Sequence, residues 1–416
     1  MKVHERFLKY VQIHTTSDPN SSSCPSAERE FDLAKILVKE LLDMGISDAR
    51  VDEHCYVYAS LPATPGYEKA PAIGLIAHMD TAPDAKGENV KAILHENYQG
   101  GDVILPATGD IMSVEKFPFL REMKGETLIT TDGTTLLGAD DKAGIAEIMT
   151  AIETIISEEI AHGRICIAFT PDEEIGAGTD AFDIKGFGAD FAYTVDGGNA
   201  GEIEYDNFNA AEATVSITGF GVHPGSAKNI MLNANNLALE FHHSLPALDR
   251  PEHTQNREGF YHLHHIQGDG SKAELNYLIR DHDFMSFNHR KQSLRKIAEV
   301  FNEKYGQATV ELTIKDSYLN MLEKIKEHFH LVETAREAIK QAGLVVQEPP
   351  VRGGTDGAHL SWEGLPCPNL GTGGFNFHGT FECTTIQRME KATQVIINIV
   401  KLYRDKSFAI EMRDCL

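Results

Sequence analysis

Acidic residues and histidines that could bind metal ions stand at the ends of predicted strands, in five segments far apart in the sequence. The segments are the HMD of His78 to Asp80, the pair Asp140–Asp141, the pair Glu173–Glu174, Asp196 in TVDGG and His378 in GGFNFHG. Side chains that converge from distant loops are how a metal site is built on an α/β sheet. Each segment alone is a weak signal, but their joint occurrence favours one shared metal site.

The spacing within two segments suggests distinct roles for neighbouring residues. In HMD, an extended chain points His78 and Asp80 the same way, so Asp80 could orient a metal-bound His78 through its far ring nitrogen. An isolated HxD is more often a satisfied histidine beside a turn-forming aspartate. Asp140 precedes a predicted helix and could bridge two cations while Asp141 caps that helix, although capping alone would explain both residues.

The segment FTPDEEIG presents Glu173 and Glu174 together after an apolar strand. Burying both carboxylates is costly unless a cation or a proton relieves their repulsion. One could bind metal while its neighbour transfers protons, and a solvated surface loop explains the pair equally well in isolation. After Asp196, two glycines allow a sharp turn and the close approach of a ligand.

The elements that must position these residues alternate between strands and helices. Short apolar runs predict buried strands at 72–77, 164–169 and 191–195, and apolar residues at helical spacing predict helices at 31–44, 142–156 and 385–403. This alternation favours an α/β fold with a mixed, mostly parallel sheet and helices on both faces. Ligands are expected at the carboxyl ends of the strands.

The pattern changes between residues 208 and 318. Alternating segments at 213–218 and 308–315, a strand-like piece near Tyr261, and helices at 233–244 and after Arg290 predict a smaller antiparallel α+β domain. We therefore expect a discontinuous catalytic domain, residues 1–207 and 319–416, that carries an inserted lid domain, residues 208–318.

Composition excludes several classes of function. Lys and Arg number 38 against 62 Asp and Glu, a formal net charge of −24, so no nucleic-acid partner is expected. No segment approaches the roughly 18 apolar residues that span a bilayer, and the opening residues lack the apolar stretch of a secretory signal. The six cysteines, Cys415 among them, are scattered like free thiols. A cytoplasmic protein without a membrane partner is expected.

Over nearly its whole length the chain resembles the two-zinc aminopeptidases, deacylases and carboxypeptidases grouped around aminoacylase and glutamate carboxypeptidase. The resemblance rests on AHMDTAPD, LLGADDKAG, FTPDEEIG, YTVDGG, GFGVHPGSAKN, NYLIRDHD, RGGTDGAHLS and LPCPNLGTGG. The stretch after His378, GTFECTT, departs from the more basic, histidine-containing segment that the family leads us to expect.

The resemblance implies two zinc ions per chain and a role for each site residue. His78 and Asp196 would bind one ion, Glu174 and His378 the other, and Asp140 would bridge them. Glu173 would be the general base and acid, and Asp80 would orient His78. Zinc suits a site of mixed histidine and carboxylate ligands.

The implied activity is that of a metal-dependent aminopeptidase, which releases the first residue of a short peptide with a free amino terminus, tripeptides in particular. A hydroxide that bridges the zinc ions would attack the scissile carbonyl, and Glu173 would take and return the proton. The alternatives are a dipeptidase, an N-acyl amino acid deacylase or a carboxypeptidase of the same family. A catalytically dead binding protein with the same fold is a third hypothesis.

Three further residues are candidates for substrate binding. By the resemblance, His223 in GVHPGSAKN would reach over the substrate and stabilise the oxyanion. Arg280 in NYLIRDHD and Arg352 in VRGGTDG could hold a carboxylate or carbonyl oxygens, because guanidinium is a planar, permanently charged fork. Arg280 could equally pair with Asp281 or Asp283. By analogy, the inserted domain could also mediate a homodimer.

Overall fold

The computed structural model describes residues 1–404, which separate into two compact units. The first unit contains Met1–Tyr205, Glu323–Pro349 and residues 355–404, and the second contains Asp206–Leu322 and Pro350–Gly354. The five described cysteines form no disulfide, and Cys415 lies outside the described residues. Within residues 1–404, no helix combines the length and the apolar character that crossing a membrane requires.

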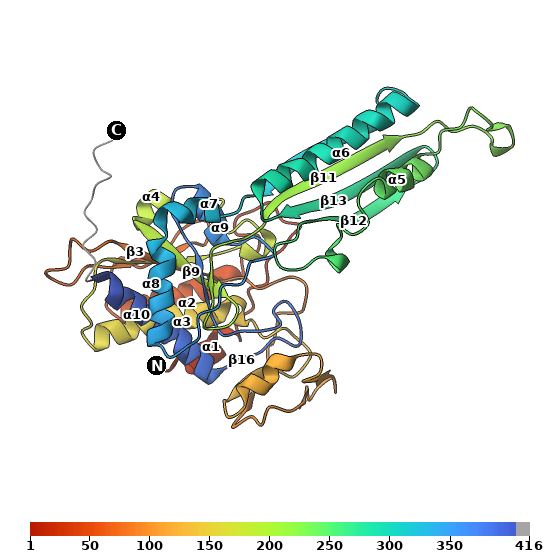
Figure 1. Cartoon of the computed structure of the whole chain (residues 1–416). Helices are drawn as coiled ribbons and strands as arrows, with labels where there is room; N and C mark the ends of the chain where they lie inside the picture. Colours follow the sequence, from red (N-terminus) through yellow and green to blue (C-terminus); the bar gives the residue numbers. More distant parts are fainter. Residues whose placement is uncertain (405–416) are drawn as a thin grey trace. The chain divides into compact units, whose positions relative to one another are not determined.

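A seven-stranded mixed sheet forms the centre of the first unit (Figure 1). Its strands, in spatial order, are β1 (Arg50–Val51), β2 (Val57–Leu61), β8 (Ile165–Thr170), β3 (Ile73–His78), β9 (Phe191–Gly197), β15 (Asn369–Gly371) and β10 (Ile203–Glu204). The central strands β8, β3, β9 and β15 run parallel, and the outer strands are antiparallel to their neighbours. The predicted mixed, mostly parallel α/β sheet is thus confirmed.

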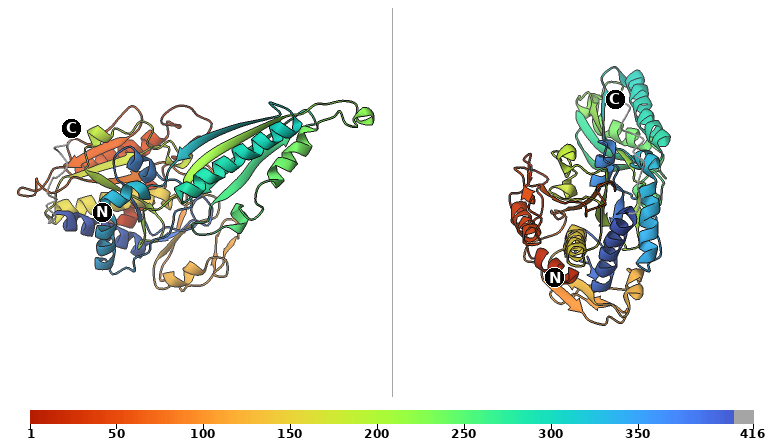
Figure 2. Two further views of the ribbon diagram at one scale, coloured as in Figure 1. Left: turned by 45° about the horizontal axis from the view of Figure 1, so that its top comes forward. Right: turned by 90° about the vertical axis from the view of Figure 1, so that its left-hand side faces the viewer.

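Helices cover both faces of this sheet, which is why β3 and β8 are buried along their whole length. On one face, α10 (Ile386–Arg404) lies between α3 (Ala139–Ser157) and α8 (His330–Gln341) (Figure 2). Two consecutive residues of β9, Ala192 and Tyr193, point to opposite faces of the sheet. The Tyr193 hydroxyl donates to the Leu331 carbonyl of α8, whereas Ala192 belongs to a core on the opposite face, beside α4 (Ile184–Phe187) and α9 (Asp356–Trp362).

The remaining elements of the first unit are short or peripheral. They are α1 (Val3–Tyr10), which packs on α3, α2 (Glu30–Asp43), which packs on β1 and β2, a three-stranded sheet of β16 (Thr384–Thr385), β7 (Leu128–Thr131) and β4 (Ala92–His95), and a hairpin of β5 (Val103–Ile104) and β6 (Ile111–Met112). A short helix, α7 (Leu322–Ile325), begins at the last residue of the main segment of the second unit. The sequence did not predict the two small sheets.

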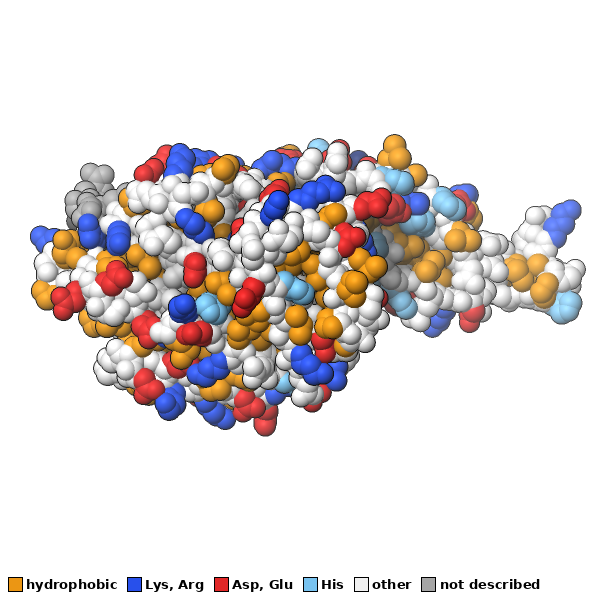
Figure 3. Space-filling view, turned by 90° about the horizontal axis from the view of Figure 1, so that it is seen from below, with side chains coloured by type: hydrophobic (Ala, Val, Ile, Leu, Met, Phe, Trp, Pro, Cys, Tyr) orange, Lys and Arg blue, Asp and Glu red, His pale blue; other side chains and the backbone are white. Residues whose placement is uncertain are grey.

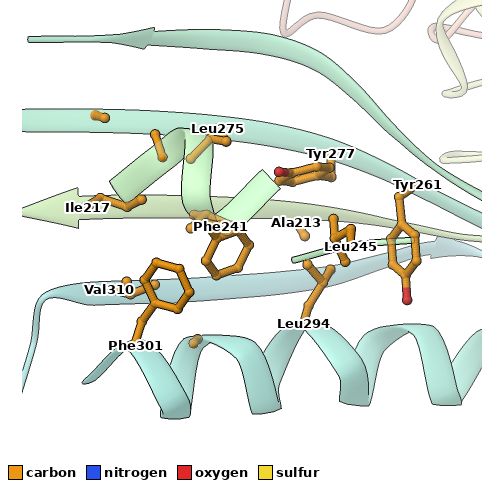
Figure 4. Close-up of a cluster of buried hydrophobic side chains, with 14 of the residues drawn as sticks. Ala213, Ile217, Phe241, Leu245, Tyr261, Leu275, Tyr277, Leu294, Phe301 and Val310 are labelled. Atoms are coloured by element: carbon orange, nitrogen blue, oxygen red, sulfur yellow. The ribbon is translucent and has the colours of Figure 1, made fainter. Parts of the chain in front are cut away.

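The second unit is a four-stranded antiparallel sheet with two helices. Its strands, in spatial order, are β12 (Phe260–Gly268), β13 (Lys272–Asp281), β11 (Asn209–Thr218) and β14 (Val310–Tyr318). Phe241 of α5 (Ala234–His243) and Phe301 of α6 (Phe284–Tyr305) pack against buried strand residues such as Leu275 and Val310 (Figure 4). Buried residues alternate with more exposed ones along β13, as a sheet with one covered face requires. The predicted smaller α+β unit is confirmed.

Two helix starts differ from the prediction. Helix α6 begins at Phe284 rather than after Arg290, because Asp283 caps it by accepting the backbone N–H of Ser286. Helix α3 begins at Ala139 rather than Lys142, but Asp140 and Asp141 within it have non-helical backbone angles. Regular helix therefore starts after the acidic pair.

Charged side chains of both signs are mixed at the surface. On the face seen in Figure 3, Lys and Arg are interspersed with Asp and Glu, so no single-sign field covers this face. The net charge of −24 is a property of the whole chain.

Candidate metal site

The seven residues predicted to bind metal, transfer protons or orient a ligand meet in the first unit, around the carboxyl ends of its parallel strands. His78 ends β3, Glu173 and Glu174 follow β8, Asp196 lies near the end of β9, and His378 is in the loop after β15, while Asp80 and Asp140 complete the group from the turn after β3 and the start of α3. This edge of a parallel sheet is where ligands bind in α/β proteins.

Asp140 lies between the two histidines, which come from opposite ends of the sequence. Nε2 of His78 is 2.8 Å from Oδ1 of Asp140, and Nε2 of His378 is 3.3 Å from Oδ2. Each oxygen of one carboxylate thus faces a different imidazole. A carboxylate in this arrangement can bridge two cations.

A second carboxylate stands beside each histidine. Oδ1 of Asp196 lies 3.4 Å from Nε2 of His78, and Oε2 of Glu174 lies 2.9 Å from Nε2 of His378. The geometry gives two groups of side chains that could each hold a metal ion: His78, Asp140 and Glu174, and His78, Asp141 and Asp196. The presence of Asp141 in the second group was not predicted.

Asp141 has the capping role that the sequence suggested, and one further contact. Its Oδ1 accepts the backbone N–H of Gly144 in the first turn of α3. Its Oδ2 accepts the backbone N–H of His78. The Asp141 side chain therefore joins the start of α3 to the end of β3 by accepting a backbone N–H group from each.

Asp80 connects the end of β3 to the turn after β8. Nδ1 of His78 is 3.2 Å from Oδ1 of Asp80. The same carboxylate accepts the backbone N–H groups of Glu173 and Glu174, at 3.0 and 3.2 Å. Asp80 is fully buried, so it can fix the ring of His78 and the position of the glutamate pair together.

Two observations show that this set of side chains is suited to binding a cation. First, Oε1 of Glu174 is buried without a hydrogen-bond partner among the described residues, a costly arrangement that a metal ion would relieve. Second, burial raises the pKa of Asp196 to about 7, and burial with repulsion from Asp140 raises that of Glu174 to about 7. These carboxylates bind positive charge favourably, whether as protons or as metal ions.

The pKa of a histidine in the cluster is raised as well, whereas that of Asp140 is lowered. Hydrogen bonds to Asp140 and then to Glu174 raise the pKa of His378 to about 11. Burial would raise the pKa of Asp140, but its hydrogen bonds to His378 and His78 outweigh that effect and lower the pKa. The chemistry of this site is that of a negatively charged cluster with a strong demand for cations.

The three predicted substrate-binding residues lie in the second unit. His223 is exposed, and its Nδ1 accepts the backbone N–H of Gly225, as expected for a turn fixed by the following proline and glycine. The Arg280 guanidinium donates to the Ala211 carbonyl at 3.2 Å and lies 5.4 Å from the ring centroid of Tyr318.

The partners of Arg280 and Arg352 bear on the alternatives for these residues. Asp281 pairs with Arg290 at 2.7 Å, and no salt bridge joins Arg280 to an acidic residue within the described chain. Arg352 donates to the carbonyls of Asn256 and Glu258 and lies 5.0 Å from the Phe208 ring centroid. Arg352 therefore anchors a loop of its own unit.

One further acidic residue of the site was not predicted from the sequence. Asp356, at the start of α9, is buried and accepts the hydroxyl of Thr170 at 2.8 Å, at the end of β8. Burial raises its pKa to about 7, and its charge also contributes to raising the pKa of Glu173. Asp356 lies in the RGGTDGAHLS motif, but nothing in its spacing marks it as part of the acidic cluster.

Known proteins share both the sequence and the fold. The sequence model of the protein family described as Peptidase family M20/M25/M40 matches residues 74–402 of this chain. Peptidase T of Caldanaerobacter subterraneus subsp. tengcongensis is 54% identical over 407 residues, which cover 97% of this chain and 99% of that protein. A tripeptidase from Staphylococcus aureus superposes with a TM-score of 0.78 at 22% identity, over 97% of this chain and 98% of that one. The aminopeptidase PepT from Bacillus cereus gives 0.76 at 21%, with the same coverage.

Proposed function

The chain belongs to peptidase family M20/M25/M40, and from that premise we propose that it is a metal-dependent aminopeptidase that releases the N-terminal residue of tripeptides. The observation that carries this proposal is the Asp140 carboxylate between His78 and His378, in a chain whose relative of 54% identity is named Peptidase T. The names of the two solved relatives, a tripeptidase and an aminopeptidase, support the same substrate class.

We assign the metal ligands from the contacts of the cluster. His78 and Asp196 would hold one zinc ion, Glu174 and His378 the other, and Asp140 both. The pairing follows the short contacts, because each histidine has its own carboxylate neighbour and shares Asp140 with the other histidine. Two such cations, when bound, supply an activated water and polarise the scissile carbonyl.

Glu173 is assigned as the general base and acid. Burial, and then the charge of Asp196, raise the pKa of Glu173 well above its ordinary value, so the carboxylate can hold a proton between two steps. A Glu173 carboxylate oxygen would accept the proton of the attacking water and return it to the leaving amine. Its position is fixed through its backbone N–H, which Asp80 accepts at 3.0 Å.

Substrate binding is assigned to His223 and Arg280, and also to Arg352, which would contribute a further guanidinium while it holds the loop of Asn256 and Glu258. In His223, Nδ1 is used by the Gly225 N–H, which leaves Nε2 to donate to an oxyanion. Arg280 donates to the Ala211 and Ile279 carbonyls through Nη1, so other donors of its guanidinium fork can bind the peptide carboxylate.

A panel of di-, tri- and tetrapeptides, free and acetylated at the amino end, tests this function. We expect the free tripeptides to be cleaved fastest, with release of the first residue, and a chelator to stop the reaction. Hydrolysis of acetylated substrates without cleavage of free tripeptides would instead support a deacylase. Undiminished activity in chelator would contradict the metal assignment.

A further inference from the structure

Glu382 is a buried acidic residue four positions after His378, in the stretch where the sequence departs from the family pattern. The residue is only 1% exposed. Its carboxylate accepts three backbone hydrogen bonds: Oε2 from Leu137 at 2.7 Å and from Gly138 at 2.8 Å, and Oε1 from Asp140 at 3.0 Å. The glutamate thus holds the turn that leads into α3.

This turn has N–H groups that the helix itself cannot satisfy. Gly138 adopts a left-handed backbone conformation with φ of 79°, and Asp140 is non-helical. N–H groups at a helix start lack intrahelical acceptors, and a buried donor without a partner destabilises the fold. A single carboxylate that accepts three of these N–H groups therefore fixes the backbone at Leu137, Gly138 and Asp140.

The loop that carries Glu382 is closed on itself and also carries His378. Phe375 and Cys383 form an antiparallel bridge, with N–H to carbonyl distances of 2.8 and 3.0 Å. Asn376 adds a side-chain hydrogen bond to the Phe381 carbonyl across the loop. His378 lies inside this closed loop, so the histidine and the glutamate belong to one hydrogen-bonded segment.

We propose that Glu382 is a positioning residue of the metal site, which locks the turn of Asp140 to the loop of His378. The inference rests on the proposed function, because it takes these two residues as metal ligands. The two oxygens of Asp140 face His78 and His378 at 2.8 and 3.3 Å. A shift of the turn would therefore disturb both cations at once.

The position of Glu382 requires two hydrogen-bond acceptors, and glutamine has only one. Both carboxylate oxygens face N–H donors. In Glu382→Gln, the amide NH₂ must point at one or more of these donors, so the turn loses an acceptor and gains a donor–donor contact. The side-chain volume is almost unchanged, which limits the damage to this contact.

The test is titration of purified wild-type and Glu382→Gln protein with Zn²⁺ alone, together with the visible absorption spectrum of the Co²⁺-loaded forms. We expect both cations to bind about 10–100-fold more weakly in the variant, with an altered cobalt spectrum and a native circular dichroism spectrum. The spectrum reports ligand geometry, which a general loss of stability would not change. A folded variant with wild-type affinity and spectrum would overturn the inference.

Asp52→Asn is the matched control. Oδ1 of Asp52 likewise accepts two backbone N–H groups, from His54 and Tyr56, in the loop between β1 and β2. We expect the Asp52→Asn protein to bind zinc with the wild-type affinity. If Glu382→Gln does not fold, Glu382→Asp takes its place: its shorter side chain withdraws the carboxylate, and wild-type affinity there would equally overturn the inference. A wild-type protein that binds no divalent cation would instead refute the proposed function.

Discussion

His78 and Asp80 face each other at the end of β3, with the imidazole Nδ1 3.2 Å from the carboxylate Oδ1. On the opposite edge of the same ring, Nε2 points to Asp140 and Asp196. Because Asp80 also accepts the N–H groups of Glu173 and Glu174, it links one proposed zinc ligand to the proposed base.

Asp80→Ala should therefore damage both metal binding and turnover. The imidazole loses its orienting partner, and two buried N–H groups lose their acceptor. We expect kcat/KM and zinc affinity each to fall about 10–100-fold, measured by steady-state kinetics and zinc titration. Asp43→Ala removes an exposed aspartate that pairs only with Lys39 within the described chain, and it should change neither quantity. Wild-type values in Asp80→Ala would contradict the orienting role.

Glu173→Gln should separate catalysis from metal binding. Glu173 is proposed to move protons without binding a cation, so its amide analogue should keep both zinc ions while kcat falls about 10²–10⁴-fold. Metal content by elemental analysis and single-turnover rates measure the two effects. Glu174→Gln is the companion variant and should lose zinc, because Glu174 contacts His378 at 2.9 Å. A Glu173→Gln enzyme that turns over at the wild-type rate would refute the assignment.

The main sheet and the convergence of the seven residues at its edge could be predicted from the sequence, because both depend on local patterns. An apolar run that ends in a polar residue, such as the run before His78, marks a buried strand and its carboxyl end at once. In a parallel sheet these ends share one edge, so segments far apart in sequence could be placed together. The family resemblance then supplied the role of each residue.

The parts that were not predicted depend on contacts between distant residues. Glu382 meets Leu137 across 245 positions, and nothing in GTFECTT indicates that its glutamate is buried. Asp141 reads as a helix cap, and its second contact, with the His78 backbone, arises only from the packing of α3 on β3. The short strands of the small sheets have two to four residues each, too few to show a period.

Zinc should stabilise the protein more as the pH rises. In the metal-free protein the pKa values of Glu174 and Asp196 are raised to about 7, from ordinary values of 4.5 and 3.8. A raised carboxyl pKa favours the folded state fully only below the ordinary value, and this stability is lost as the pH rises towards 7. Zinc replaces these protons, so protons compete with it at low pH.

The measurement is the increase in Tm on adding zinc, at several pH values between about 5 and 8. Groups that titrate alike with and without zinc change both Tm values equally, so they do not affect the increase. We expect the increase to grow most steeply up to about pH 7 and more gently above it, where the proton on His378 still competes with zinc. An increase that is constant or that shrinks with rising pH would contradict the raised pKa values of the two carboxyls.

Glu147 offers a pH effect away from the proposed ligands. The residue lies inside α3 with 0% exposure, and neither carboxylate oxygen has a hydrogen-bond partner among the described residues. Burial raises its pKa well above the ordinary 4.5. The folded protein therefore holds this proton more tightly than the unfolded chain does, and the associated stability declines as the pH rises above 4.5.

Glu147→Gln removes the ionisable group while keeping its size, so the pH-dependent loss should disappear. In zinc-loaded protein, the free energy of unfolding of the variant relative to wild type should rise with pH from about 5, by at most about 1.4 kcal/mol per pH unit. Urea unfolding at each pH measures it. Glu158→Gln, at the exposed end of the same helix, should follow the wild type throughout. If Glu147→Gln also follows the wild type at every pH, Glu147 does not carry a buried proton.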